Sequence, residues 1–559
     1  MIRHSISSER IRITFGETPL TVREVRNEET GASLLRGGTQ AMLLRLPGRI
    51  SDPVFLTEVA SADWSADAAA WVLTDKDRAF HASISVRPTP EGLRFDAAVT
   101  GPRPVWLAEW KLDGVDVREF ILPALGGQSL SSSMPPDTQL SFKYPFWWNA
   151  QFAIGAGNGG GLWLHARDVD PRFKLIRLKR TGGRFLVSYG FEAEGPLRSN
   201  TLGATWYVDG YRGTWRTPVE RHRAWLESAF GLTPLQENRF WPAWANDITF
   251  VLEMWGIGKE SPHPLHTFDD MARRLRAWAR MYDPTRTMVY VPGFAEHGID
   301  SRAPFYRPSE ELGGADSFRR LVDLAHRLGY RVMPHTNALC MTFEHPLYEE
   351  FRQHQVVDVF GREQGWALDI DGDWLAEPYF AYINPGAEAW GELMEKVIGE
   401  LIRQYGADAI FLDQTLLAFN VARGPDFVAG MRRHLERLQR AYPETLFAGE
   451  GLHEQVLGAL PMAQIHGIDS ITEVHGLEGR VRWRRAHPVS THLFGKYTRL
   501  TAHLLTKHPS HPLFALQERA YASLGVLPAL CLYNRSQALD GPDVRRMIRR
   551  AKELERSRR

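Results

Sequence analysis

Cysteine is scarce in this sequence of 559 residues, which holds only Cys340 and Cys531. Two cysteines cannot build a disulfide framework, and their small number fits a reducing compartment. The first twenty residues lack the apolar segment of a secretory signal. No run of about 18 uncharged apolar residues occurs, as a membrane-spanning helix would require. We therefore expect a cytoplasmic protein without a membrane partner.

An excess of charge of either sign is also missing. The 67 Lys and Arg residues balance the 66 Asp and Glu residues, for a formal net charge of +1. A nucleic-acid binder usually shows a clear basic excess, so we expect no nucleic-acid partner. The 18 tryptophans are many for this length. Tryptophan packs in large cores and also stacks on flat apolar faces such as sugar rings, so composition leaves both roles open.

Several functional motifs are absent. The glycine run at 157–161 is not followed by a helix or by Lys-Ser/Thr, so we interpret it as a hairpin turn rather than a phosphate loop. No Gly-x-Ser-x-Gly sequence is present, which argues against an esterase. The acidic stretch Asp369–Asp373 has Trp374 and Phe380 where a calcium-binding EF-hand loop needs Gly and Glu. We expect neither a metal nor a cofactor.

The first 212 residues read as β structure. Short stretches of alternating apolar and polar residues recur, for example at 79–86, 93–99 and 185–191, with turn residues between them. Many short strands with frequent turns predict a β-sandwich over residues 1–212. A helical pattern follows from Gly213 to Phe230 and ends at Gly231, so residues 213–240 are predicted to be a helical linker.

From Asp247 onward, apolar strands alternate with helices. This order predicts a parallel sheet covered on both faces, and the number of units favours a (β/α)8 barrel over residues 241–559. The fold class is therefore a multidomain protein with an all-β sandwich and an α/β barrel. The predicted sixth strand is SITEVHG (Ser470–Gly476), and the seventh falls in a poorly defined region between Pro488 and Leu524. Val526–Leu532 is the predicted last strand, although it contains Pro528.

Polar side chains gather where the apolar strands of the predicted barrel end. Barrel enzymes carry their active sites at this end of the strands, and each ionisable group placed there costs desolvation unless it has a partner. The candidates in chain order are Glu253, Trp255, Tyr290, His335, Asn337, Asp413, Gln414, Glu450, His453 and Glu473.

Glycoside hydrolysis is a reaction that uses two carboxyl groups and needs no cysteine nucleophile or phosphate loop. Asp413 and Glu450 end adjacent strands of the predicted barrel, so their carboxyls are expected about 5 Å apart, the separation of a retaining enzyme. The acid of the pair should have a raised pKa because of burial and the neighbouring carboxylate. Structural roles compete with this hypothesis: Asp413 could cap a helix, and Glu450 could pair with an arginine of the barrel.

Two segments carry a family resemblance. The run from Tyr382 to Gln414 (YINPGAEAWGELMEKVIGELIRQYGADAIFLDQ) and the later FAGEG (Phe447–Gly451) resemble the endo-α-N-acetylgalactosaminidase families of barrel glycoside hydrolases and their uncharacterised relatives. Asp on strand four with Glu on strand five is also similar to the order in the α-amylase clan. The resemblance implies that Asp413 is the nucleophile, that Glu450 is the acid/base, that the linkage is α, and that the sandwich is mutarotase-like.

The sequence departs from these relatives because no all-β segment follows the barrel. The α-galactosidase and α-glucosidase groups instead place the acid on strand six, so Glu473 stays a candidate. The alternatives are an inverting hydrolase or a transglycosylase that uses Asp413 with Glu473. A barrel that binds carbohydrate without catalysis is a further alternative.

The remaining candidates have predicted roles in substrate binding. We expect an oligosaccharide or glycoside substrate, with Glu253, His335, Asn337, Gln414 and His453 among its polar contacts. Tyr290, Trp255 and Trp366 could stack on a sugar ring. Trp148 belongs to the aromatic sequence FWWN (Phe146–Asn149), which is either a packing patch or a lid that shapes a subsite. The oligomeric state stays open, and a homo-oligomer is one of the states that the sequence allows.

Overall fold

A computed structural model describes residues 4–258, 263–368, 377–468, 471, 483–503, 513–532, 535 and 537–558 of the chain. The chain divides into two units. The first comprises Met1–Gly231 and Val474–Leu493, and the second comprises Leu232–Glu473 and Phe494–Arg559. None of the helices in the described ranges combines the length and the apolar character needed to cross a membrane.

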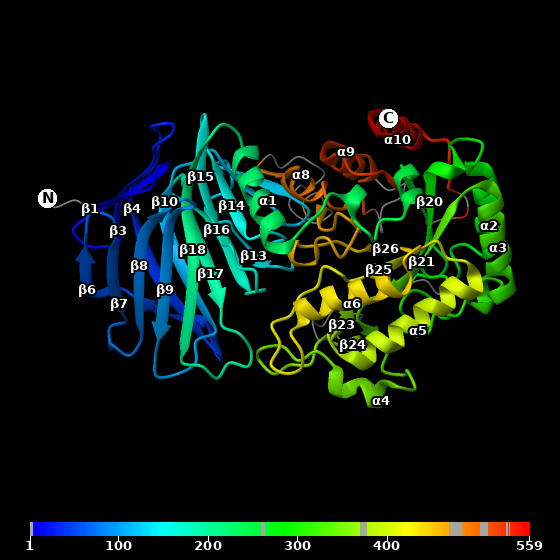
Figure 1. The fold of residues 1–559 in the computed structure, drawn as a ribbon, viewed down its shortest axis with the longest axis horizontal. Helices are drawn as coiled ribbons and strands as arrows, with labels where there is room; N and C mark the ends of the chain where they lie inside the picture. Colours follow the sequence, from blue (N-terminus) through cyan, green and yellow to red (C-terminus); the bar gives the residue numbers. More distant parts are fainter. Residues whose placement is uncertain are drawn as a thin grey trace. The chain divides into compact units, whose positions relative to one another are not determined.

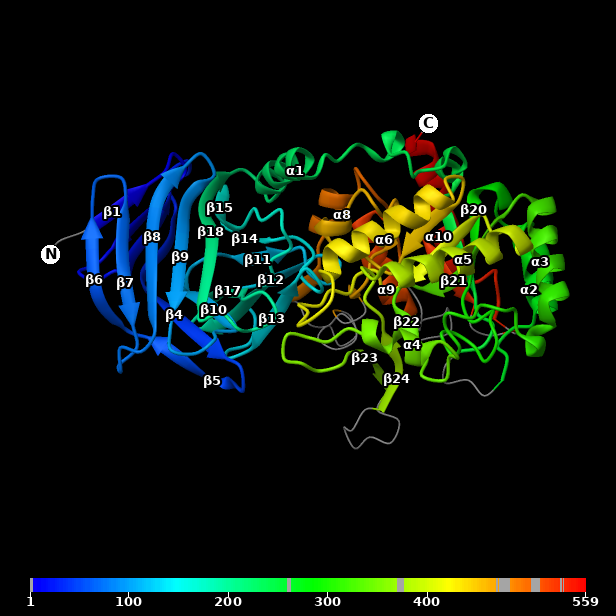
Figure 2. The same cartoon turned by 60° about the horizontal axis from the view of Figure 1, so that its bottom comes forward.

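Two antiparallel sheets make up most of the first unit (Figures 1 and 2). The nine-stranded sheet contains β1 (His4–Ser7), β2 (Ile11–Phe15), β3 (Thr21–Asn27), β4 (Ser33–Leu46), β5 (Arg49–Leu56), β10 (Leu107–Val115), β13 (Gln139–Tyr144), β16 (Lys174–Thr181) and β17 (Arg184–Glu192). The ten-stranded sheet contains β6 (Glu58–Trp64), β7 (Ala69–Thr74), β8 (His81–Thr89), β9 (Gly92–Thr100), β11 (Glu119–Leu122), β12 (Gln128–Ser131), β14 (Phe152–Ala156), β15 (Gly160–His165), β18 (Thr201–Arg212) and β28 (Arg484–Ala486).

The two sheets pack face to face through aromatic side chains. Trp110 of β10 contacts Phe95 of β9 and Trp206 of β18 across the interface, with ring centroids 5.5 and 5.4 Å apart. These rings are buried because alternate residues of each strand point to the interior. The predicted many-stranded β structure of the N-terminal region is confirmed.

One helix and one distant strand complete the first unit. Helix α1 (Arg216–Phe230) ends at Gly231, whose φ of 61° is in the left-handed region that terminates helices. Strand β28 comes from far along the chain and pairs with β12, so that Arg484 lies opposite Leu130. The buried Arg484 guanidinium donates to Gln128 Oε1 at 2.8 Å. No pattern in the sequence predicted this return.

The second unit is built on eight parallel strands in the order β29-β27-β26-β25-β21-β20-β19-β30. A parallel bridge between Thr501 and Leu527 links the two ends of this order, so the sheet forms a nearly closed barrel. The predicted α/β barrel is confirmed at this level. Its strands are β19 (Phe250–Met254), β20 (Thr287–Val291), β21 (Arg331–Asn337), β25 (Ala409–Asp413), β26 (Leu446–Gly449), β27 (Met462–Gln464), β29 (Arg499–Thr501) and β30 (Ala529–Leu532).

The sixth strand corrects a prediction. It is β27, which ends at Gln464, rather than SITEVHG at residues 470–476. That segment lies outside the described residues except for Ile471. Strand β27 has only three residues, which is too short to show a periodicity that could be recognised in the sequence. The seventh strand, β29, is equally short and lies in the region that the sequence left undefined.

Helices and a small sheet surround the barrel. Helix α2 begins with a capping box, in which Thr267 and Asp270 satisfy each other's backbone N–H groups. The described helices of the barrel are α2 (Phe268–Trp278), α3 (Gly314–Leu328), α4 (Tyr348–Phe351), α5 (Glu388–Tyr405), α6 (Phe427–Ala441), α9 (Phe514–Leu524) and α10 (Pro542–Arg558), while α8 (Val489–Phe494) lies where the chain passes from the first unit back to the second. A three-stranded sheet joins β22 (Cys340–Met341), β24 (Glu377–Tyr382) and β23 (Gly365–Leu368).

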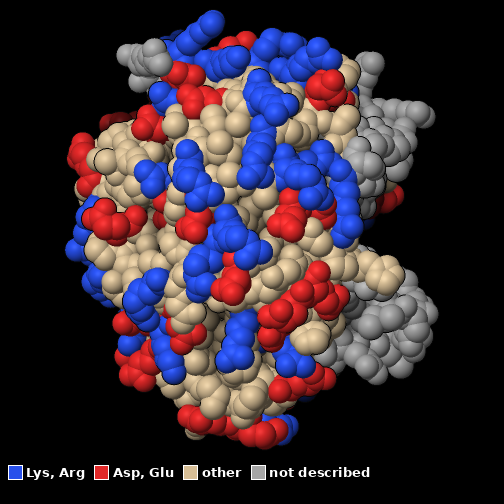
Figure 3. Space-filling view, turned by 90° about the vertical axis from the view of Figure 1, so that its right-hand side faces the viewer, with Lys and Arg blue, Asp and Glu red and all other residues tan. Residues whose placement is uncertain are grey.

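The outer surface of the second unit carries charges of both signs. On the face shown in Figure 3, basic and acidic side chains are interspersed, with apolar and uncharged residues between them. Mixed charges of this kind produce no strong field of one sign over that face.

Candidate active site

The barrel places ionisable and polar side chains from neighbouring strands side by side. Glu253 of β19 lies opposite Tyr290 of β20, and Asn337 of β21 lies opposite Asp413 of β25. His335 lies two residues before Asn337 on the same strand and therefore points to the same side of the sheet. The structure thus brings five of the predicted residues together.

A hydrogen-bond chain fixes the orientation of these groups. Burial raises the pKa of the Tyr290 hydroxyl well above its usual range, and the charge of Asp413 raises it further. The hydroxyl therefore keeps its proton and donates it to His335 Nδ1 at 2.7 Å. With Nδ1 as the acceptor, the ring proton lies on Nε2, which donates to Asp300 Oδ1 at 3.1 Å.

Asp300 is a site residue that the sequence reasoning missed. It lies in the loop between β20 and α3, has a φ of 56°, and is 3% exposed. The second oxygen of its carboxylate, Oδ2, accepts a hydrogen bond from Asn337 Nδ2 at 3.2 Å. A buried carboxylate held by two donors is well placed to accept a hydroxyl of a ligand. Nothing in the local sequence marks it, because it does not end a strand.

Gln414 connects the two predicted catalytic carboxylates. Its backbone lies in the left-handed region with a φ of 64°, unusual for a residue other than glycine. The side-chain amide accepts from Asn337 Nδ2 and donates to the hydroxyl of Tyr382, each at 3.2 Å. The backbone N–H donates to Glu450 Oε2 at 3.0 Å. Since Gln414 follows Asp413 directly, this bond ties Glu450 to the end of the strand that carries Asp413.

Two histidines that the sequence reasoning also missed flank Glu450. His466 follows the sixth strand, and its Nε2 lies 3.2 Å from Glu450 Oε1. His503 follows the seventh strand, and its Nε2 lies 4.0 Å from the same oxygen. The two imidazole centroids are 4.5 Å apart. Both histidines come from strands of three residues, which explains why the pattern of strand ends did not reveal them.

The pKa of Glu450 differs from the expectation. Burial acts to raise it, but the charge and hydrogen bond of His466, the charge of His503 and the Gln414 N–H outweigh burial and lower it. The expected raised pKa of this acid is therefore wrong. The sequence argument counted burial and carboxylates but had no means of placing imidazoles beside the carboxyl.

Two groups of side chains in the described part of the chain are close enough to consider as metal ligands. They are Glu450 with His466 and His503, and Asp300 with His335 and Asp413, and in each group the candidate atoms lie within 4.8 Å of one another. Each group contains an imidazole and a carboxylate at hydrogen-bond distance. We assign the contacts of His335 with Asp300 and of His466 with Glu450 as hydrogen bonds.

Three further predicted residues lie on the same strands or just beyond them. Glu253 is fully buried, and its charge contributes to the raised pKa values of Tyr290 and of the Cys531 thiol. Trp255 is also buried, and its carbonyl accepts from His266 Nδ1 at 2.9 Å. Burial lowers the pKa of His453 to about 3, so this imidazole is neutral. No hydrogen bond among the described residues joins His453 to the chain around Asp300.

The small sheet carries another predicted residue. Trp366 of β23 stacks on Phe380, with ring centroids 5.8 Å apart and planes inclined by 11°. The neighbouring Tyr379 hydroxyl lies 3.2 Å from Ser301 Oγ, beside Asp300. Together with Tyr382, this contact places strand β24 against the polar cluster. Glu473, the alternative acid, lies outside the described residues, as does the acidic stretch at 369–373.

The predicted role of Trp148 as a substrate platform is corrected. Its side chain has no exposed surface and lies in the core of the β-sandwich, where it contacts the rings of Tyr144 and Tyr189. The indole N–H donates to the carbonyl of Phe152 at 2.9 Å. A ring enclosed in this way cannot stack on a sugar, so the packing interpretation of the aromatic sequence holds for Trp148.

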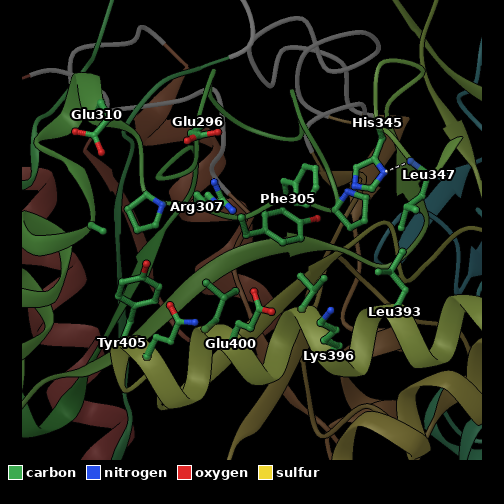
Figure 4. Close-up of a pocket in the computed structure, with 17 residues that line it drawn as sticks. Glu296, Phe305, Arg307, Glu310, His345, Leu347, Leu393, Lys396, Glu400 and Tyr405 are labelled. Atoms are coloured by element: carbon green, nitrogen blue, oxygen red, sulfur yellow. Dashed lines mark hydrogen bonds between the residues drawn. The ribbon is translucent and has the colours of Figure 1, made fainter.

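A cavity of about 610 Å³ lies apart from the carboxylate cluster. Figure 4 shows it between helix α5, which contributes Lys396 and Glu400, and the loop that contributes Phe305 and Arg307. None of the predicted site residues lines it. Its wall includes Tyr306, whose hydroxyl accepts the backbone N–H of Asn337 at 2.8 Å. The cavity therefore borders the polar cluster through one side chain without containing it.

Residues 202–464 match a family described as "Domain of unknown function (DUF6259)". A search of curated proteins found no match.

Solved structures give broader matches. The α-N-acetylgalactosaminidase NagBb from Bifidobacterium bifidum is 14% identical, with a TM-score of 0.74, over 100% of this chain and 93% of that one. The GH36 α-galactosidase AgaA from Geobacillus stearothermophilus is 10% identical, with a TM-score of 0.50, over 100% and 86%. The α-galactosidase TtGalA from Thermus thermophilus, solved with stachyose, is 14% identical, with a TM-score of 0.50, over 88% and 99%. At these identities the likeness establishes the fold.

Proposed function

We propose that the protein is a retaining glycoside hydrolase that cleaves α-linked sugars, with Asp413 as nucleophile and Glu450 as acid/base. The observation that carries the proposal is the pair of carboxylates on the adjacent parallel strands β25 and β26, tied together by the hydrogen bond from the Gln414 N–H to Glu450. Adjacent strands lie about 4.8 Å apart. This spacing is close to the ~5–5.5 Å that separates the two carboxyls of retaining enzymes.

The roles follow from the chemistry of the two groups. Asp413 attacks the anomeric carbon and forms a covalent glycosyl ester, while the electron pair of the broken bond goes to the leaving oxygen. Glu450 gives that oxygen a proton. In the second half Glu450 takes a proton from water, which releases the sugar from Asp413 with its original configuration. Asp300, held by His335 and Asn337, accepts a hydroxyl of the bound sugar and so positions the anomeric carbon.

The proposed substrate class is an α-galactoside or an α-N-acetylgalactosaminide, in an oligosaccharide or a glycoconjugate. Support comes from the similar solved structures, whose titles name an α-N-acetylgalactosaminidase and α-galactosidases. The neutral polar groups around Asp300 suit such a sugar, because the Asn337 and Gln414 amides can bond neutral hydroxyls. We also propose that the β-sandwich is mutarotase-like.

Activity on aryl glycosides tests the proposal. Wild-type enzyme should release the aryl group from α-galactosides or α-N-acetylgalactosaminides and not from the β anomers. Asp413→Asn and Glu450→Gln should each lower kcat by at least about 100-fold. Added azide should restore turnover of an activated substrate by Glu450→Gln, because a small nucleophile needs no general base. Near-wild-type turnover in either variant would remove that residue from its role.

The first-formed anomer separates the proposal from its alternatives. NMR of the initial product should show the α anomer if Asp413 and Glu450 act by double displacement. A β product, together with inactivation by Glu473→Gln but not by Glu450→Gln, would assign the acid to Glu473 and an inverting route. Tight sugar binding by calorimetry without turnover would identify a barrel that binds carbohydrate without catalysis.

A further inference from the structure

Glu450 is held by groups from several strands of the barrel. Its Oε2 accepts the Gln414 N–H from the fourth strand, and its Oε1 faces His466 from the sixth strand and His503 from the seventh. The side chain of Glu450 is 13% exposed, and that of His466 is 22% exposed. The carboxyl and its imidazole partner are therefore partly shielded from bulk water.

Other titratable groups also face this carboxyl. Asp413 carries the neighbouring negative charge, and the charges of Asp413 and Glu450 both act on Tyr290 of β20 and Tyr382 of β24. The pKa values of both tyrosines are raised, first by burial, so they stay neutral. Among the described residues, His466 and His503 act to lower the pKa of Glu450, and His466 is the closer of the two.

The surroundings of Glu450 conflict with its proposed role as the general acid. A general acid must hold a proton when substrate binds, yet the surroundings of Glu450 favour its ionised form. A lone carboxyl in this state would be a competent base and a poor acid. The proton required for the first step must be stored close by, because the step occurs within a shielded site.

We propose that Glu450 and His466 share one proton and act as a pair, with His466 as the positioning residue that stores the proton between one catalytic cycle and the next. This inference rests on the proposed function. In the free enzyme the pair is a carboxylate and an imidazolium, with the Nε2 proton directed at Oε1 over 3.2 Å. A bound sugar excludes water and penalises separated charges, so the proton moves from Nε2 to Oε1 and both partners become neutral.

Over the two half-reactions, the Glu450–His466 pair returns to its starting protonation state. The carboxylic acid passes its proton to the glycosidic oxygen as that oxygen takes the electron pair of the broken bond. The Glu450 carboxylate, now facing a neutral imidazole, is the base of the second half-reaction. It removes a proton from the attacking water, and the proton returns to His466 Nε2 when the product leaves. No oxidant, reductant or other reactant is required.

The distances to Glu450 Oε1 show which of the two histidines exchanges the proton. Nε2 of His503 is 4.0 Å from Glu450 Oε1, longer than a hydrogen bond, whereas Nε2 of His466 is 3.2 Å away. His503 is 3% exposed and its ring lies against that of His466. It therefore stabilises the orientation of the His466 ring rather than exchanging the proton.

The first test varies the leaving group. His466→Gln keeps an N–H donor near the position of Nε2 but cannot titrate, and His466→Phe removes both properties. For alkyl α-glycosides, whose leaving oxygen needs a proton, kcat/KM should fall roughly 10- to 100-fold in both variants, which is part of the 10²- to 10⁴-fold contribution of a general acid. For 2,4-dinitrophenyl α-glycosides, which leave without protonation, the change should be less than about threefold.

His326→Gln is the matched control. It also removes an imidazole–carboxylate pair, with Asp408 at 2.8 Å, but at the opposite end of the strand that carries Asp413. Both substrates should be cleaved at wild-type rates by this variant. Full activity of His466→Gln on alkyl glycosides would overturn the proposal, because a hydrogen bond alone would then suffice. Equal losses on both substrates would overturn it in favour of a structural role.

The second test does not depend on activity. NMR of protein labelled at histidine Cε1 should show one ring signal that disappears in His466→Gln. The titration midpoint of that signal should move to lower pH in Glu450→Gln, because the carboxylate that stabilises the imidazolium is gone. An unmoved midpoint would overturn the shared proton. If the midpoint moves in Glu450→Gln but the wild-type protein cleaves no glycoside, the Glu450–His466 pair stands and the proposed function is overturned.

Discussion

At the residue scale, the backbone of Gln414 is under strain that serves the site. A residue with a β-carbon rarely adopts a φ of 64°, and such outliers persist only where the surroundings over-determine them. Here the side chain bonds Asn337 and Tyr382 while the backbone N–H bonds Glu450. The strained turn thus lets one residue orient groups from three other strands.

Replacement of Gln414 separates strain from function. Gln414→Gly should relieve the backbone and change the free energy of unfolding by less than about 1 kcal/mol, because relief of strain offsets the lost side-chain bonds. kcat/KM should still fall about tenfold or more, since Asn337 Nδ2 loses one of its two acceptors and Tyr382 loses its amide donor. Denaturant unfolding and steady-state kinetics measure the two effects. A large stability loss with normal activity would contradict this account.

Trp148 provides a second residue-scale prediction. Trp148→Phe removes the indole N–H bond to Phe152 and leaves a small cavity in the sandwich core. The free energy of unfolding should fall by about 2 kcal/mol. KM for every active substrate should stay unchanged, because the ring does not contact ligand. A KM change without a stability loss would restore the role as a substrate platform.

The residues of the site differ in how visible they are in the sequence. Asp413 and Glu450 could be predicted because each follows a continuous apolar strand. Asp300 could not, since it lies within a loop and is brought to the site by the bonds from His335 and Asn337. His466 could not either, because a strand of three residues leaves no pattern to recognise.

At the element scale, helix α3 is fastened to the start of strand β25 by one ion pair. His326 Nε2 donates a hydrogen bond to Asp408, which raises the pKa of His326. Burial works against the ionised Asp408, but bonds from His326, the Val332 N–H and Arg331 outweigh it and lower the pKa of that carboxyl. The strand whose far end carries Asp413 is anchored by this contact.

Because of the ion pair between His326 and Asp408, we expect the stability of the protein to depend on pH. Because the pKa of His326 is raised in the folded state, its charge contributes fully to the free energy of unfolding below about pH 6.5. This contribution is lost as the pH rises through the folded-state pKa. The contribution of Asp408 is lost only below about pH 4. His326→Gln should therefore cost about 0.5–1 kcal/mol at pH 5.5, a modest figure because the histidine is partly exposed, and less at pH 8.5. Urea unfolding at both pH values measures this. Equal losses would assign the effect to the hydrogen bond rather than to charge.

The elements themselves were predictable where they were long. Helix α1 ends at Gly231 as predicted, and strand β30 lies within Val526–Leu532, the predicted last strand. The sixth and seventh strands could not be located, because three residues such as MAQ carry neither strand nor helix periodicity. Their place in the sheet is set by pairing with β26 and by the bridge to Leu527, which is long-range information.

At the scale of the whole molecule, the chain passes from the first unit to the second, returns, and leaves again. Strand β28 lies at the edge of the ten-stranded sheet and covers β12, and the buried Arg484 bonds Gln128. Burial lowers the pKa of Arg484 to about 10, and Gln128 Oε1 accepts a hydrogen bond from the buried guanidinium. The first unit is consequently incomplete in residues 1–231.

A fragment of residues 1–231 tests this dependence. It should expose the edge of β12 and aggregate at lower temperature than the full chain, because an uncovered strand edge templates further pairing. Fusion of residues 483–493 through a flexible Gly/Ser linker should restore the missing strand and raise the aggregation temperature. Light scattering during heating measures the difference. A fragment as soluble as the fused form would show that β28 is dispensable.

The position of β28 in the sequence also determines when the first unit can be completed during synthesis. A ribosome delivers the N-terminal unit first, at ~5–20 residues per second. Here the edge strand of that unit emerges only after most of the barrel has been made, some tens of seconds later. During that interval the nascent sandwich carries an open edge while the first barrel strands are already outside the exit tunnel. Completion of the first unit is thereby coupled to synthesis of the second.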